Sequence, residues 1–135
     1  MLNSQKFGIE LYENLGKLFY AVAIIDGTVH TKEIDRLRSY IRNYWLDVDE
    51  IEDEYGSDAA FRIETTFDWL LEYEKEANDC YDQFVEFYGE HEKMFNSKVK
   101  NLASETANAI ANAFANKNKS ELILLSKIDL LFGQY

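Results

Sequence analysis

The stretch of sequence that decides the fold is residues 15–34, which read LGKLFYAVAIIDGTVHTKEI. Its apolar residues, continued toward the N-terminus, recur in steps of three and four, the spacing of one face of a helix. They are Phe7, Leu11, Leu15, Leu18, Val22 and Ile25. Asp26-Gly27 ends this helix, because glycine adopts the left-handed conformation of a helix C-terminus without a steric clash. Thr31 offers an N-cap for a second helix, whose positive end favours Glu33. The stretch therefore predicts a helix, a short loop and a second helix.

Two glycines, Gly8 and Gly16, fall inside the first predicted helix. A glycine in a helix interior costs about 1 kcal/mol of stability relative to alanine. We therefore expect a close-packing reason for glycine on this helix.

Helical spacing continues through the rest of the chain. Further helices are predicted from about Asp58, from about Ser97 and from Ser120 as a cap, and Asn78-Asp79 either caps another helix or lies within a longer one. No segment alternates with a period of two for long enough to predict a strand. The predicted fold class is all-α, a compact antiparallel bundle of about six or seven helices, because the connections are short.

Composition narrows the class of protein further. The chain has 135 residues, of which 47% are hydrophobic and none is proline, so it can form one core but lacks the turns of an all-β domain. Cys80 is the single cysteine, which excludes an internal disulfide and a cysteine-based zinc site. The longest apolar run, residues 18–25, is too short to span a bilayer, and the first residues do not resemble a signal peptide. The sequence therefore predicts a single domain, 1–135, in the cytoplasm.

Charge is distributed unevenly along the chain. The formal net charge is −11, but residues 47–92 hold 17 acidic residues against Arg62 and Lys75, a charge of −15, and the remainder carries +4. This balance argues against nucleic-acid binding, which needs clustered Lys and Arg. Two interpretations of the acidic segment stay open. It is either a solvated face that keeps the protein soluble, or a surface that attracts a basic protein partner or divalent cations.

The loop after the first helix has the spacing of half a calcium-binding loop. Asp26, Gly27, Val29 and Glu33 match positions 5, 6, 8 and 12 of an EF-hand. In that arrangement the glycine turn lets carboxylates before and after it converge on a hard cation. Apolar residues occupy positions 1 and 3, so this is not an EF-hand, and a cation site here would need oxygens from elsewhere in the fold.

Residues 15–34 also resemble the TerB-like family, which includes tellurite-resistance proteins and the helical region of the membrane-anchored co-chaperone DjlA. The hallmark of that family is an apolar helix ending in Ala-x-x-Asp-Gly, a short loop, and Ser/Thr-x-x-Glu or a close variant opening the next helix. Ala23, Asp26-Gly27 and Glu33 stand at these places. The resemblance implies an all-α fold with a weak internal repeat. It places the first helix–loop–helix at about 5–46, the acidic middle at 47–95 and the second copy at about 97–135.

The resemblance further implies a divalent cation, such as calcium, held by acidic residues around the two loops. Asp26 and Glu33 match the first copy of the motif, and Glu121 matches the second. The second copy departs from the pattern, because Asn116-Lys117 replaces Asp-Gly and the loop is two residues shorter. A lysine beside a cation is unfavourable through like-charge repulsion. No other cofactor is implied.

These residues also have a purely structural interpretation. Asp-Gly is a common helix stop, and a glutamate near a helix start is stabilised by about 0.3–1 kcal/mol with no metal present. The sequence contains no catalytic triad spacing, phosphate-binding glycine loop or nucleophile elbow, and its histidines, His30 and His91, form no Glu-x-x-His pair. It therefore predicts a non-enzymatic interaction or stress-response module with a cation site. The alternative is an acidic domain that binds a basic partner through 47–92 without a metal.

Overall fold

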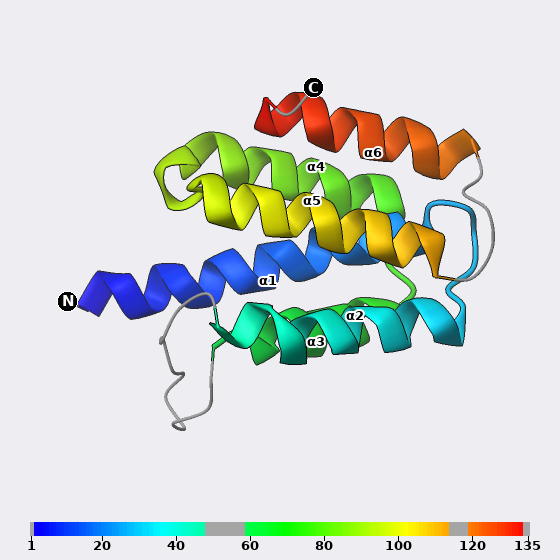
Figure 1. The fold of residues 1–135 in the computed structure, drawn as a ribbon, viewed down its shortest axis with the longest axis horizontal. Helices are drawn as coiled ribbons and strands as arrows, with labels where there is room; N and C mark the ends of the chain where they lie inside the picture. Colours follow the sequence, from blue (N-terminus) through cyan, green and yellow to red (C-terminus); the bar gives the residue numbers. More distant parts are fainter. Residues whose placement is uncertain (1, 48–58, 114–118, 134–135) are drawn as a thin grey trace.

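The computed structural model describes residues 2–47, 59–113 and 119–133. These residues form six α-helices and two short 3-10 helices and contain no strand (Figure 1). The α-helices are α1 (Leu2–Ile24), α2 (Thr31–Asn43), α3 (Phe61–Glu72), α4 (Ala77–Glu90), α5 (Ser97–Asn112) and α6 (Lys119–Phe132), and the 3-10 helices are η1 (Trp45–Asp47) and η2 (Glu92–Met94). The predicted all-α bundle is confirmed.

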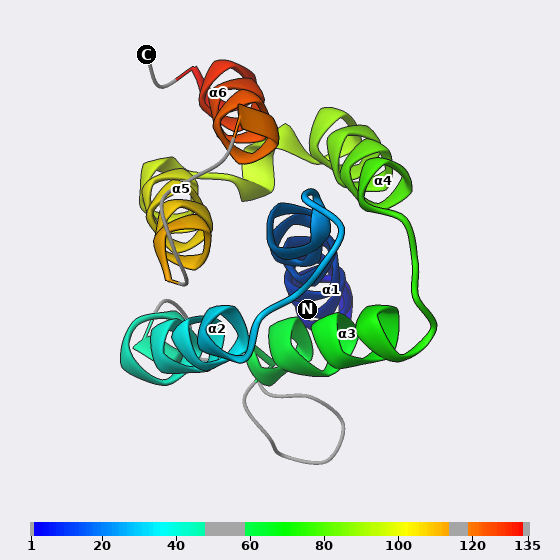
Figure 2. The same cartoon turned by 90° about the vertical axis from the view of Figure 1, so that its right-hand side faces the viewer.

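Helix α1 lies at the centre of the bundle. In the end-on view the other five helices surround it, and α1 packs against α3, α4, α5 and α6 (Figure 2). Successive helices run in opposite directions (Figure 1). The α1–α2 loop, the α3–α4 connection and the first turn of α6 therefore lie at the same end of the molecule.

The central position of α1 explains its composition. The sequence pattern predicts one buried face, but every side chain from residue 18 to residue 23 is fully buried. A helix that is apolar on all sides is one that neighbours cover on all sides. Each outer helix buries only one stripe, such as Leu37, Ile41 and the Trp45 that follows α2.

One of the two helix glycines has the predicted close contact. A Cβ atom on Gly16 would lie 2.9 Å from the carbonyl oxygen of Ile63 and 2.9 Å from Cβ of Thr66, both in α3. That spacing is too short for real atoms, so α3 approaches α1 closely only because Gly16 has no side chain. The same helix pair is held from the side by Arg62, whose guanidinium lies 3.3 Å from Oε2 of Glu13.

Three predicted helix starts are wrong by one to three residues. Thr31 is the first residue of α2, and His30 is the N-cap, with an extended backbone at φ −96° and ψ 147°. Glu76, rather than Asn78-Asp79, precedes α4, and Ser120 lies inside α6. Side-chain type alone predicts these N-caps, whereas the backbone hydrogen bonds of the preceding loops decide where each helix begins.

The start of α5 agrees with the sequence, because Oδ1 of Asn96 accepts a hydrogen bond from Val99 N at 2.9 Å and caps a helix that begins at Ser97. Tyr44, which follows α2, is 50% exposed, whereas its neighbour Trp45 is buried. Helix α3 begins at Phe61, and the expected start near Asp58 lies outside the described residues.

Candidate functional site

The loop between α1 and α2 has the predicted turn. Gly27 has φ +102°, a conformation that favours glycine, and its N–H donates to Ile24 O at 2.8 Å. Oδ1 of Asp26 accepts a hydrogen bond from Thr28 N at 3.3 Å, which closes the next turn of the loop. Asp26 is exposed at this end of the bundle.

Glu33 is buried at the start of α2. It is the third residue of the helix and only 2% exposed. Its Oε1 accepts a hydrogen bond from His30 N at 2.8 Å, and Glu33 N donates to His30 O at 2.9 Å. Glu33 therefore satisfies the N-cap backbone, which is the half of a capping box that a glutamate supplies.

Burial is the main reason that the pKa of Glu33 is raised from its ordinary 4.5 to about 7. The hydrogen bond from His30 lowers this pKa, and the negative charges of Asp26 and Glu121 raise it again. Water stabilises a carboxylate better than a protein interior does, so removal from water favours the protonated form. At neutral pH the Glu33 carboxyl is thus poised between its neutral and charged forms.

Glu121 occupies the corresponding place in the second hairpin. It is the third residue of α6, as Glu33 is the third residue of α2, and it is 4% exposed. Its charge acts on Glu33 although 88 positions separate the two in the sequence. The negative charges of Asp26 and Glu121, the two other residues predicted as ligands, thus both act on Glu33.

The three carboxylates do not form a ready-made metal cage. Across residues 2–47, 59–113 and 119–133, no group of three or more His, Cys, Asp or Glu side chains is arranged to hold a metal ion. The predicted ligand set stays a prediction. Asn116-Lys117, the pair that stands in place of Asp-Gly in the second copy of the motif, lies outside the described residues.

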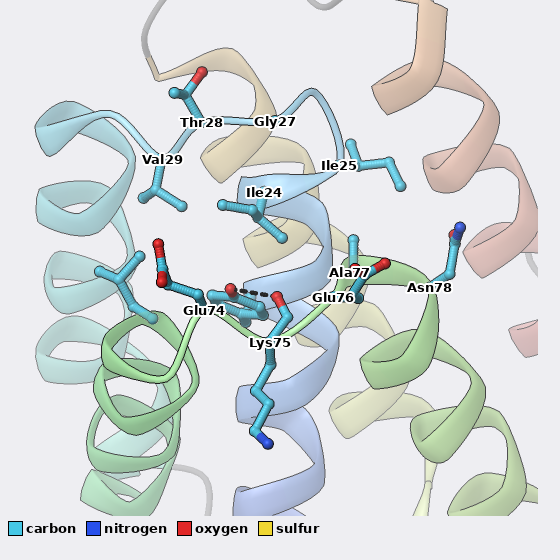
Figure 3. Close-up of a pocket in the computed structure, with 12 residues that line it drawn as sticks. Ile24, Ile25, Gly27, Thr28, Val29, Glu74, Lys75, Glu76, Ala77 and Asn78 are labelled. Atoms are coloured by element: carbon cyan, nitrogen blue, oxygen red, sulfur yellow. Dashed lines mark hydrogen bonds between the residues drawn. The ribbon is translucent and has the colours of Figure 1, made fainter.

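A cleft of about 510 Å³ opens between the α1–α2 loop and the α3–α4 connection (Figure 3). Ile24, Val29 and Leu71 give it apolar walls, and Glu74 and Glu76 add acidic groups. This lining suits an apolar or cationic group better than an anion. Sequence reasoning missed the cleft, because its two sides come from loops about 45 residues apart.

The α3–α4 connection has a left-handed backbone conformation at a residue that is not glycine, which the sequence does not predict. Glu74 has φ +51°, Glu74 N donates to Leu71 O at 3.2 Å, and Lys75 N donates to Leu70 O at 3.0 Å. This is a Schellman motif, in which glycine is the usual residue at the left-handed position. The hydroxyl of Tyr20 donates to Lys75 O at 2.6 Å and ties the connection to α1 (Figure 3).

Two groups near this end that could act as nucleophiles are held in their neutral forms. Burial raises the pKa of the Tyr20 hydroxyl, and nearby Cys80 and Glu74 raise it further. Burial is also the main cause of the raised pKa of the Cys80 thiol, with Lys17 opposing it. Activated cysteines have lowered pKa values. His91 stacks on Phe87 with ring centroids 4.4 Å apart.

The described part of the acidic segment keeps its strong charge. Residues 59–92 contain ten acidic residues and two basic ones, Arg62 and Lys75, a net charge of −8. They form α3, α4 and the connection between them. The acidic residues at 48–58 lie outside the described residues, so the predicted surface over 47–92 is described only in this second part.

Comparisons of the chain with protein-family models, with curated proteins and with solved structures found no match. In the part of the chain that the structure describes, no helix has both the length and the apolar character needed to cross a membrane.

Proposed function

We propose that this chain is a non-enzymatic, TerB-like helical module that binds a divalent cation between the starts of α2 and α6. The observation that carries the proposal is the pair of buried glutamates, Glu33 and Glu121, each the third residue of its helix. Asp26 lies close enough for its charge to act on the same group. In the TerB-like interpretation, such a module serves a stress response of the tellurite-resistance type.

A positive charge or a proton stabilises two buried carboxyl groups whose negative charges repel each other. An ionised carboxylate in a protein interior is costly unless it is paired, hydrogen-bonded or bound to a metal. Carboxylate oxygens are the ligands that calcium and magnesium prefer, and magnesium is commonly held by one or two carboxylates with several waters. A divalent cation would therefore neutralise Glu33 and Glu121 together and hold the start of α2 beside the start of α6.

Calorimetry at pH 8 tests this proposal, because the Glu33 carboxyl, whose pKa is about 7, then favours its charged form. Calcium, magnesium and manganese are titrated into the wild type, Glu33→Gln, Glu121→Gln and the control Glu105→Gln, which removes an exposed carboxylate from α5. We expect the first two variants to bind at least about tenfold more weakly and the control to match the wild type. Equal isotherms for all four proteins, or no binding heat with any of the ions, would refute the cation site.

A second candidate function is binding of a basic protein partner by α3 and α4. The net charge of −8 on residues 59–92 favours it, since the rest of the chain outside 47–92 is positive. Such association is expected to weaken steeply as salt screens the charges. A partner whose capture does not change between 50 mM and 500 mM salt would contradict this function.

A further inference from the structure

Two large aromatic side chains are exposed on α3. Trp69 is 50% exposed and Tyr73 is 59% exposed, and their ring centroids lie 4.8 Å apart with the planes tilted by 42°. They are one helical turn apart, so they form one surface on the same face of the helix. Phe61, the first residue of α3, is also exposed, at 37%. Exposed tryptophan and tyrosine are the residues that most often carry the binding energy of protein interfaces.

Acidic residues are frequent in the chain next to this aromatic surface, where Glu72, Glu74 and Glu76 are exposed. Asp68 is also exposed, but its Oδ1 lies 3.7 Å from a guanidinium nitrogen of Arg38 in α2, so its charge is shared with that ion pair. Lys17 lines a hollow that also includes Trp69, so a positive group of α1 borders the surface as well. An aromatic face combined with surrounding carboxylates attracts a cation with an apolar stem, which describes lysine and arginine side chains.

The chain already places one such cation on the surface. Nζ of Lys75 lies over the ring of Trp69, 5.3 Å from its centroid. The Schellman turn at Glu74 brings Lys75 back toward α3, and the hydrogen bond from Tyr20 holds its carbonyl. The backbone is thus fixed, whereas the Lys75 side chain extends away from the α1–α2 loop and is exposed (Figure 3). An exposed cation–π contact is weak, so a cation supplied by a partner can replace Lys75.

We propose that Trp69 and Tyr73 are the anchor at which this protein binds an arginine- or lysine-rich segment of a partner protein, and that Lys75 occupies this anchor in the free protein. This inference rests on the second candidate function and gives it a location. Charge complementarity favours a basic segment as the occupant, because the surface lies within the residues that carry a net charge of −8.

A second aromatic pair provides an internal control. Tyr40 and Tyr44 of α2 also pack as a tilted pair, with centroids 5.0 Å apart and planes at 51°, and Tyr44 is 50% exposed. Their surroundings are basic rather than acidic, since α2 contains four Lys and Arg residues against two acidic ones. Tyr44→Ser therefore removes an equally exposed ring without touching the proposed anchor.

The test uses a synthetic peptide of six arginines alternating with glycine, titrated into the full chain at 50 mM salt and followed by calorimetry. We expect Trp69→Ser to weaken binding about tenfold, Tyr73→Ser to weaken it severalfold, and Tyr44→Ser to leave it unchanged. Circular dichroism confirms that each variant is folded. A glutamate–glycine peptide of the same length is expected not to bind.

Lys75→Gln sharpens the test, because it removes the internal occupant. We expect this variant to bind the arginine peptide about threefold more tightly than Lys93→Gln, an exposed substitution with the same change of charge. Equal binding by wild type and Trp69→Ser, with salt still weakening both, would overturn the anchor and leave the acidic surface standing. No binding of the arginine peptide at 50 mM salt would overturn the anchor and the second candidate function together.

Discussion

The two helical hairpins, α1–α2 and α5–α6, use the same local device in different surroundings. The second helix of each hairpin begins with a buried glutamate at its third position, Glu33 in α2 and Glu121 in α6. Their first helices differ, because α1 is central and fully buried over residues 18–23, whereas α5 is one of the surrounding helices. A glutamate at this position usually caps a helix at the surface. Its burial in both hairpins therefore reflects how the hairpins pack together.

The sequences of the two hairpins can be aligned by matching Asp26 with Asn116, and the aligned residues of α1 and α5 then differ in their contacts. Gly16 of α1 then corresponds to Thr106 of α5, and both are buried. Gly16 leaves room for the backbone of α3. Thr106 instead accepts a hydrogen bond from Trp45 Nε1 at 3.0 Å and donates to Leu102 O at 2.7 Å. These two corresponding positions thus serve a close helix contact in one hairpin and a buried hydrogen bond in the other.

Replacing Gly16 by threonine, the residue at the matched position of the second hairpin, should have the largest effect on the free energy of unfolding. Gly16→Thr adds atoms where a Cβ would lie 2.9 Å from Ile63 O, so α3 must move away from α1. We expect the free energy of unfolding to fall by about 3 kcal/mol, as urea denaturation measures it.

Thr106→Val is the matched change in the second hairpin. It leaves the buried Trp45 Nε1 without its acceptor and should lower the free energy of unfolding by about 1–2 kcal/mol, less than Gly16→Thr. A Gly16→Thr variant as stable as the wild type would show that α1 and α3 are not held at this distance in solution.

The next prediction concerns Glu33, whose contribution to the free energy of unfolding depends on pH. The folded-state pKa of Glu33 is about 7 against an ordinary 4.5. Folding therefore favours the protonated form, and stability declines as pH rises from about 4.5 to about 7 and stays low above that window. Glu33→Gln keeps an acceptor for His30 N and removes the charge. In the presence of a chelator we expect it to stabilise the protein by about 2 kcal/mol at pH 8 and to have little effect at pH 4.

Urea denaturation of wild type and Glu33→Gln at both pH values measures this difference. Glu105→Gln serves as the exposed control and should change stability little at either pH. A destabilising effect of Glu33→Gln at pH 8 in chelator would mean that Glu33 is charged and well paired in the fold. It would contradict the statement that burial and the charge of Glu121 raise the pKa of Glu33.

The smallest effect concerns how helices end. Gly27 follows α1 with φ +102° and Gly133 follows α6 with φ +72°, but Glu74 takes the left-handed position after α3 with φ +51°. Glu74→Gly should raise the free energy of unfolding by about 0.5–1 kcal/mol, because glycine enters this conformation without a steric penalty. Thermal unfolding monitored by circular dichroism would detect the rise. An unchanged midpoint would mean that Glu74 makes a compensating contribution in the connection.

Much of the fold was readable from local spacing. The steps of three and four residues predicted each helix, and Asp26-Gly27 predicted the end of α1. The start of α5 at Ser97 also follows from local chemistry, because the cap at Asn96 bonds within its own turn. The predicted N-cap of α2 is wrong by one residue, since His30 precedes the helix and its backbone N–H donates to Glu33.

The sequence by itself determined the helices and the turn at Gly27, because these depend on side-chain period and on backbone conformation within a few residues. Only the tertiary structure decided that α1 is the central helix, that Gly16 meets α3, and that Glu33 is buried where the charge of Glu121 acts on it. It also decided that Lys75 turns back onto Trp69. The physical reason is that burial, close contact and pKa shift depend on which distant segments pack together, and a local pattern carries no information on that choice.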